Sequence, residues 1–129
     1  MRVLLDTHAL LWWAPSGGSR LSATARDLIA DSSTVVFVSA ASAFEIAVKS
    51  ALGRLDLPDE PERYVPVLLE RHGFRQLPVE VSHALRAGAL PDLHRDPWDR
   101  LLVAQAQLAG LPLVTADPAI GRYEVSVIW

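Results

Sequence analysis

Short apolar runs alternate along the chain with longer segments in which apolar residues recur every three or four positions. The runs are rich in aliphatic and β-branched residues, which is typical of buried strands. Strands are predicted at residues 2–5, 34–39, 74–79, 111–117 and 124–129. Because helical segments separate them, the sequence predicts an α/β fold with a mainly parallel sheet and helices on both of its faces.

The helical segments carry recognisable start and stop signals. Helices are predicted to begin near residue 9 and to cover residues 22–31, 42–55, 61–73, 80–90 and 96–110. Ser22 is a favoured N-cap residue, Pro97 suits a first helical turn, and Gly110 suits a helix end. Pro66 lies inside the 61–73 segment, and we expect it to divide or kink that helix.

Two of the predicted strands end on an aspartate. Asp6 follows the run at residues 2–5, and Asp117 closes the run at residues 111–117. Each has an ordinary explanation, because Asp6 can cap the following helix and Asp117 can form a turn before Pro118. In a parallel sheet, however, both would face the edge where the strands end, and ligands bind at that edge.

Glu45 lies in a helical segment with almost no polar face around it. Its neighbours from residue 43 to residue 48 are alanine, phenylalanine, isoleucine and valine. One explanation is an ion pair with Lys49, one helical turn later. We favour a functional acid held against the core, because a buried carboxylate without a partner is costly.

Two further acids flank Pro97 at the start of the last predicted helix. Asp96 is well placed to cap that helix. Asp99 falls in its first turn, where the helix dipole favours a negative charge. The candidate acids that come from four separate elements are Asp6, Glu45, Asp99 and Asp117. If the fold gathers them, a hard divalent cation such as Mg²⁺ or Mn²⁺ would relieve their repulsion.

Composition narrows the possible chemistry. The chain has 129 residues, half of them hydrophobic, and we expect residues 1–129 to form a single domain. It contains no cysteine, which excludes disulfides and thiolate metal sites. The net charge of −3 argues against a protein that reads duplex nucleic acid. It does not argue against an enzyme that binds one phosphodiester through a metal ion.

The apolar stretches are too short to span a membrane. Asp6 and His8 interrupt the apolar start of the chain, and no small-residue cleavage site follows. We therefore expect no signal peptide and a cytoplasmic protein.

Four stretches of sequence resemble a known family. They are LLDTHALLWW, SAASAFEIAVKSALGRL, LPDLHRDPWDRLLVAQAQLAGLPLVTAD and YEVSVIW, and they follow one another over nearly the whole chain. Together they resemble PIN-domain proteins of the VapC toxin type. The resemblance implies a three-layer α/β/α sandwich around a mainly parallel sheet. It also implies a Mg²⁺- or Mn²⁺-dependent endoribonuclease that inhibits translation and growth.

The resemblance also implies roles for individual residues. The catalytic, metal-holding residues would be Asp6, Glu45, Asp99 and Asp117. Supporting or substrate-contacting residues would be Thr7, Thr115, Asp96 and Arg100. The implied reaction is attack of an activated water on phosphorus, which leaves a 5′ phosphate and a 3′ hydroxyl. His8 and His94 lie near these acids, and we expect local hydrogen bonding from them rather than contact with RNA.

Protein partners are implied in the same way. One is a small cognate antitoxin of the VapB or Phd type, whose tail would cover the active-site cleft. The other is a second copy of the chain, in a homodimer and in a toxin–antitoxin hetero-oligomer. Trp12 and Trp13 are candidates for these interfaces, although packing in the core explains them equally well.

Three other classes fit the residues less well. A receiver-type signalling domain needs an aspartate at the end of a central strand, where this chain has Ser39. A phosphatase with an aspartate nucleophile needs two acids flanking one residue, whereas Thr7 and His8 follow Asp6. In a purely structural interaction protein the four acids would be coincidental.

Overall fold

A five-stranded parallel sheet forms the centre of the computed structural model, which describes the backbone of residues 1–129 and all side chains except those of Pro15 and Ser16. The strands are β1 (Arg2–Leu5), β2 (Val35–Ser39), β3 (Arg75–Leu77), β4 (Leu113–Val114) and β5 (Val127–Ile128). The helices are α1 (Thr7–Ser16), α2 (Ala23–Ala30), α3 (Ala40–Ala51), α4 (Pro61–His72), α5 (Val81–Ala89) and α6 (Pro97–Ala109), with a 3-10 turn η1 (Ile120–Arg122). The strand order is β3-β2-β1-β4-β5, with every neighbouring pair parallel.

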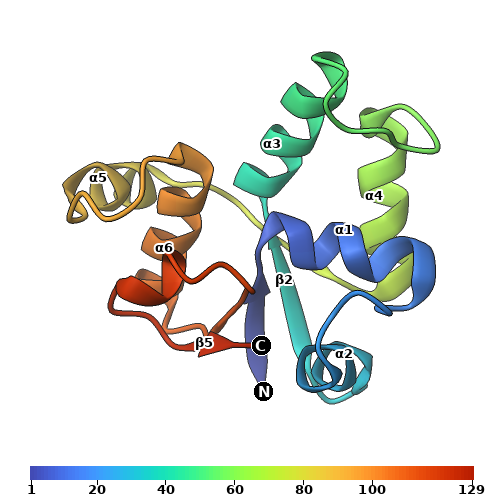
Figure 1. Ribbon diagram of the computed structural model, residues 1–129, viewed down its shortest axis with the longest axis horizontal. Helices are drawn as coiled ribbons and strands as arrows, with labels where there is room; N and C mark the ends of the chain where they lie inside the picture. Colours follow the sequence, from blue (N-terminus) through green and yellow to red (C-terminus); the bar gives the residue numbers. More distant parts are fainter.

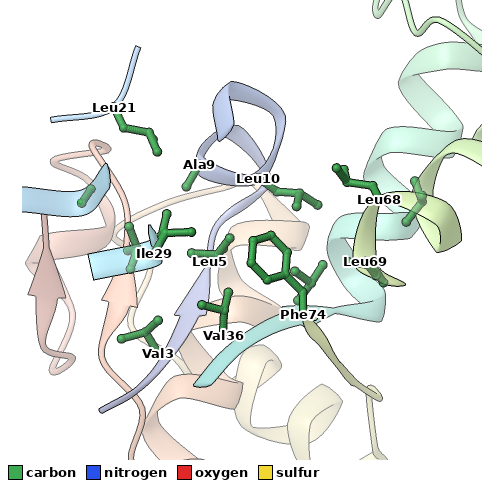
Figure 2. Packing of buried hydrophobic residues seen from close by; sticks show 14 of the residues in the cluster. Val3, Leu5, Ala9, Leu10, Leu21, Ile29, Val36, Leu68, Leu69 and Phe74 are labelled. Carbon is green, nitrogen blue, oxygen red and sulfur yellow. The ribbon is translucent and has the colours of Figure 1, made fainter. Parts of the chain in front are cut away.

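Alternating side chains of β1 divide the core into two layers. Val3 and Leu5 belong to one apolar cluster and Leu4 to the other, and all three are fully buried. Helices α1, α2 and α4 cover the first face, and α5 and α6 lie on the opposite side (Figure 1). Figure 2 shows Leu10 and Leu68 converging on the first face. The predicted three-layer sandwich is confirmed.

Local signals set most of the helix boundaries where the sequence predicts them. The Ser22 hydroxyl accepts a hydrogen bond of 3.0 Å from the backbone N–H of Ala25 and caps α2. Pro97 is the first residue of α6, and Gly110 ends it with φ of 65°, a conformation that glycine adopts without strain. Among the described residues, no helix has both the length and the apolar character of a membrane span.

The expected division of the helix at Pro66 is wrong, because α4 runs without a break from Pro61 to His72. Proline removes the N–H that would bond to the carbonyl of Glu62. Both residues lie on the exposed side of α4, so water can reach that carbonyl. On the other side, Val65 and Leu68 pack into the core and hold the helix in place.

The carboxyl ends of β1 and β4 lie side by side at the centre of the sheet. Leu5 pairs with Val114, and the N–H of Asp6 donates a 3.1 Å hydrogen bond to the Val114 carbonyl. Asp6 and Thr115 therefore leave the sheet at the same edge. The prediction that the two acid-ended runs face one edge is confirmed.

Candidate active site

Asp6 both caps a helix and faces the next strand. Its Oδ1 accepts a 2.8 Å hydrogen bond from the N–H of Ala9, so it is the N-cap of α1. Its Oδ2 accepts a 2.5 Å hydrogen bond from the Thr115 hydroxyl beyond β4. The residue is 5% exposed, and burial raises the pKa of its carboxyl group, although the hydrogen bonds from Thr115 and Ala9 lower it.

Thr115 connects Asp6 to Asp117. Its hydroxyl donates to Asp6 and accepts a 3.0 Å hydrogen bond from the N–H of Asp117. The Oδ1 of Asp117 accepts a 2.8 Å hydrogen bond from the N–H of Ala119, which is the expected turn before Pro118. The negative charge of Asp117 also raises the pKa of Asp6. One hydroxyl therefore fixes both strand-end acids relative to each other.

Glu45 is buried, and both of its carboxylate oxygens have hydrogen-bond partners. It is 3% exposed, its Oε1 accepts a 2.5 Å hydrogen bond from the Thr7 hydroxyl, and its Oε2 accepts one from the Lys49 ammonium. Ser42 Oγ lies 3.0 Å from Thr7 Oγ1 and supports that contact. Our argument that Glu45 lacks a partner is wrong, because α3 places Lys49 one turn away. Glu45 therefore forms the ion pair with Lys49 and also accepts the hydrogen bond from Thr7.

Asp96 and Asp99 make different contacts at the start of α6. Asp96 Oδ1 accepts hydrogen bonds of 2.9 Å from Trp98 N and 3.1 Å from Asp99 N, so Asp96 caps the helix. Asp99 Oδ2 lies 2.8 Å from His94 Nε2. The pKa of Asp99 is raised to about 6, mainly by burial and also by the charges of Asp96 and Glu45, although the hydrogen bond from His94 lowers it.

His94 lies between Asp99 of α6 and Asp117, which follows β4. Its Nε2 lies 2.8 Å from Asp99 Oδ2 and 3.5 Å from Asp117 Oδ2. The ligand atoms that these three residues offer all lie within 4.8 Å of one another. The donor set therefore fits a divalent cation, with Asp6 attached to Asp117 through Thr115. From the sequence alone, local hydrogen bonding is the only role that we predict for His94. Its position five residues before Asp99 was the one available signal.

Arg100 points away from the acids. Its Nη2 donates hydrogen bonds of 2.8 Å to the Ala87 carbonyl and 3.1 Å to the Leu90 carbonyl. Its Nη1 donates bonds of 3.2 Å each to the carbonyls of Pro91 and His94. Arg100 thus holds the segment between α5 and α6 that carries His94. Contact between Arg100 and RNA stays a prediction.

A groove of about 930 Å³ opens beside Glu45 and Thr7. Its cationic lining residues are Arg20, Lys49, Arg54 and Arg71, and its acidic ones besides Glu45 are Asp56 and Asp59. Trp12 lines it, with the Arg20 guanidinium 4.8 Å from the centre of its ring. Trp13 packs against the core, its ring centroid 6.5 Å from that of Phe74. A role for either tryptophan in an interface stays a prediction.

Replacing Asp99 by Asn is expected to stabilise the metal-free protein above pH 6. The folded-state pKa is about 6 against 3.8 for a free aspartate, so the folded chain holds this proton more tightly than the unfolded chain. Stability therefore falls as pH rises from about 4 to 6 and stays low above that. With partial exposure taken into account, we expect Asp99→Asn to gain about 1 kcal/mol at pH 8.

Urea unfolding in EDTA at pH 4, 6 and 8 would measure this difference between Asp99→Asn and the unmodified chain. The gain should shrink toward zero at pH 4. A gain in stability that is constant with pH, or a loss of stability at pH 8, would contradict a raised pKa for Asp99.

Comparisons with known proteins identify the family of this chain. The PIN domain family model matches residues 3–125. Ribonuclease VapC16 of Mycobacterium tuberculosis is 37% identical over 73 residues, which are 54% of this chain and 52% of that protein. The match thus spans about half the length of this relative.

Solved structures share the fold at low identity. VapBC2 from Rickettsia felis, bound to a promoter DNA fragment, aligns with a TM-score of 0.66 and 12% identity over 99% of this chain and 98% of that chain. A toxin–antitoxin complex from Klebsiella pneumoniae aligns with a TM-score of 0.66 and 20% identity over 98% and 96%. FitAcB from Neisseria gonorrhoeae aligns with a TM-score of 0.61 and 19% identity over 100% and 97%. Because the family model matches residues 3–125 of its 129, the chain belongs to the PIN domain family.

Proposed function

We propose that this chain is a metal-dependent endoribonuclease toxin of a toxin–antitoxin pair. The observation that carries the proposal is the convergence of Asp99, Asp117 and His94 within 4.8 Å, at the sheet edge where Asp6 ends β1. Support also comes from the PIN domain match and from the similarity to ribonuclease VapC16. Carboxylates brought this close favour a site that binds Mg²⁺ or Mn²⁺ and acts on a phosphodiester.

The four acids act together in this proposal. Asp6, Asp99 and Asp117 would hold the ion, and Glu45 would complete the site from α3. When bound, the ion supplies positive charge for the phosphate and a water of lowered pKa. The Thr115 hydroxyl keeps Asp6 and Asp117 in register, and the Thr7 hydroxyl and Lys49 fix the two oxygens of Glu45.

The reaction in this proposal needs no protein nucleophile. Water attacks phosphorus in line, the bond to the 3′ oxygen breaks, and the products carry a 5′ phosphate and a 3′ hydroxyl. The groove beside Glu45 offers cationic side chains such as Arg20 and Arg54 to the RNA backbone. Cleavage of cytoplasmic RNA would stop translation and growth.

The same proposal includes protein partners. A toxin–antitoxin complex is among the solved structures that share this fold, which supports an antitoxin as a partner. We expect this antitoxin to cover the acidic site and the chain to form a homodimer within the larger assembly. A basic side chain of the antitoxin would be attracted to the carboxylates. Antitoxin-free protein is therefore the form in which activity should be measured.

Incubation of antitoxin-free protein with total RNA tests the proposal. We expect discrete fragments with Mg²⁺ or Mn²⁺ and intact RNA with EDTA. The fragments should be digested by an exonuclease that requires a 5′ phosphate. Intact RNA from correctly folded protein with both metals would overturn the proposal, and cleavage that persists in EDTA would overturn its metal requirement.

A further inference from the structure

We propose that His94 is itself a ligand of the divalent cation, which makes the site a mixed nitrogen and oxygen centre. This inference rests on the metal dependence in the proposed function. It concerns a side chain that lies outside the four acids. Its basis is the position of one ring nitrogen, His94 Nε2, between the carboxylates of Asp99 and Asp117.

The spacing of the three donor atoms suits one ion. His94 Nε2 lies 2.8 Å from Asp99 Oδ2 and 3.5 Å from Asp117 Oδ2, and all three donors lie within 4.8 Å of one another. Around an octahedral ion with bonds of about 2.1 Å, neighbouring ligands are about 3 Å apart and opposite ones about 4 Å. The distances from the ring nitrogen to the two acids are thus close to those between neighbouring ligands of one ion, and ion binding would replace the hydrogen bond between His94 and Asp99.

The backbone that carries the ring is held in place. Arg100 donates 3.2 Å hydrogen bonds to the carbonyls of His94 and Pro91, and the Tyr123 hydroxyl donates a 3.1 Å bond to the same Pro91 carbonyl. The His94 side chain is 23% exposed, so one edge remains open to solvent. A ring carried by an ordered backbone loses less entropy when it takes up an ion, which favours a ligand role.

A nitrogen donor changes which ion the site prefers. Mg²⁺ favours oxygen ligands, whereas imidazole suits transition metals, and affinity rises from Mn²⁺ toward later members of the row. We therefore expect Mn²⁺ to bind more tightly than Mg²⁺. We also expect the Mn²⁺ advantage to shrink when the imidazole is removed.

Binding of the ions alone, without RNA, tests the inference. We expect His94→Ala to weaken Mn²⁺ binding by about tenfold or more in calorimetry and to weaken Mg²⁺ binding much less. His94→Gln provides a second variant of similar size. The control is His72→Ala, which removes an imidazole that packs against Trp13 and Phe74. This control should leave both affinities unchanged, with folding checked by circular dichroism.

Pulsed electron paramagnetic resonance of bound Mn²⁺ gives a direct reading on the unmodified chain. We expect the signature of a coupled histidine nitrogen, retained in His72→Ala and absent in His94→Ala. No nitrogen coupling, or equal or tighter Mn²⁺ binding by His94→Ala, would overturn the ligand role while leaving the proposed nuclease in place. Failure of the unmodified chain to bind either ion would overturn both.

Discussion

Asp6→Asn is expected to lower the rate of RNA cleavage by about 10²–10³-fold, through loss of several kcal/mol of transition-state stabilisation, while the protein stays folded. Asparagine caps helices as well as aspartate does, so the bond to the Ala9 N–H can be kept. The Thr115 hydroxyl can turn from donor to acceptor toward the new amide. The substitution removes the negative charge of Asp6, which we propose binds the metal ion.

Asp31→Asn is the matched control for this change. Asp31 is also an aspartate that accepts a hydrogen bond from a backbone N–H, 2.9 Å from Ser33 N, but it lies before the amino end of β2. The substitution Asp31→Asn therefore makes the same chemical change at the edge where the strands begin, opposite the edge that carries Asp6. Cleavage rates at saturating Mn²⁺, with melting temperatures, should separate Asp6→Asn from Asp31→Asn. Equal rates in the two folded variants would leave Asp6 as a helix cap only.

The sequence could predict the parts of this site that depend on backbone periodicity. An apolar run fixes where a strand ends, and parallel pairing brings the ends of neighbouring strands to one edge. That reasoning is enough to bring Asp6 and Asp117 together. The cap role of Asp96 is equally local, because it depends only on the residues that begin α6. Such features follow from a few neighbouring residues.

Contacts that depend on tertiary packing were not predictable in the same way. Glu45 finds both Lys49 on its own helix and Thr7 from α1, and the second contact depends on how α1 crosses α3. His94 reaches Asp117 because the segment between α5 and α6 follows one particular course. Pro66 fails to break α4 because packing of the opposite face outweighs one lost hydrogen bond.

Arg100 donates hydrogen bonds to four carbonyls in and beside the loop that carries His94, so Arg100→Ala should be strongly destabilising. We expect a loss of about 2–4 kcal/mol in the free energy of unfolding, because the guanidinium bonds to the carbonyls of Ala87, Leu90, Pro91 and His94. Arg100→Lys should recover only part of this, since an ammonium cannot reproduce the planar fork.

Arg86→Ala provides the control on the neighbouring helix, because Arg86 makes one exposed 3.2 Å hydrogen bond to the Gln107 side chain. Urea unfolding should place it within about 0.5 kcal/mol of the unmodified chain. We further expect Mn²⁺ binding to weaken in Arg100→Ala under conditions where that variant is still folded, and not in Arg86→Ala. Equal stability of the two variants would show that other contacts order the loop. In that case the preorganisation of His94 would have a different origin, because the carbonyls between α5 and α6 would not depend on the guanidinium.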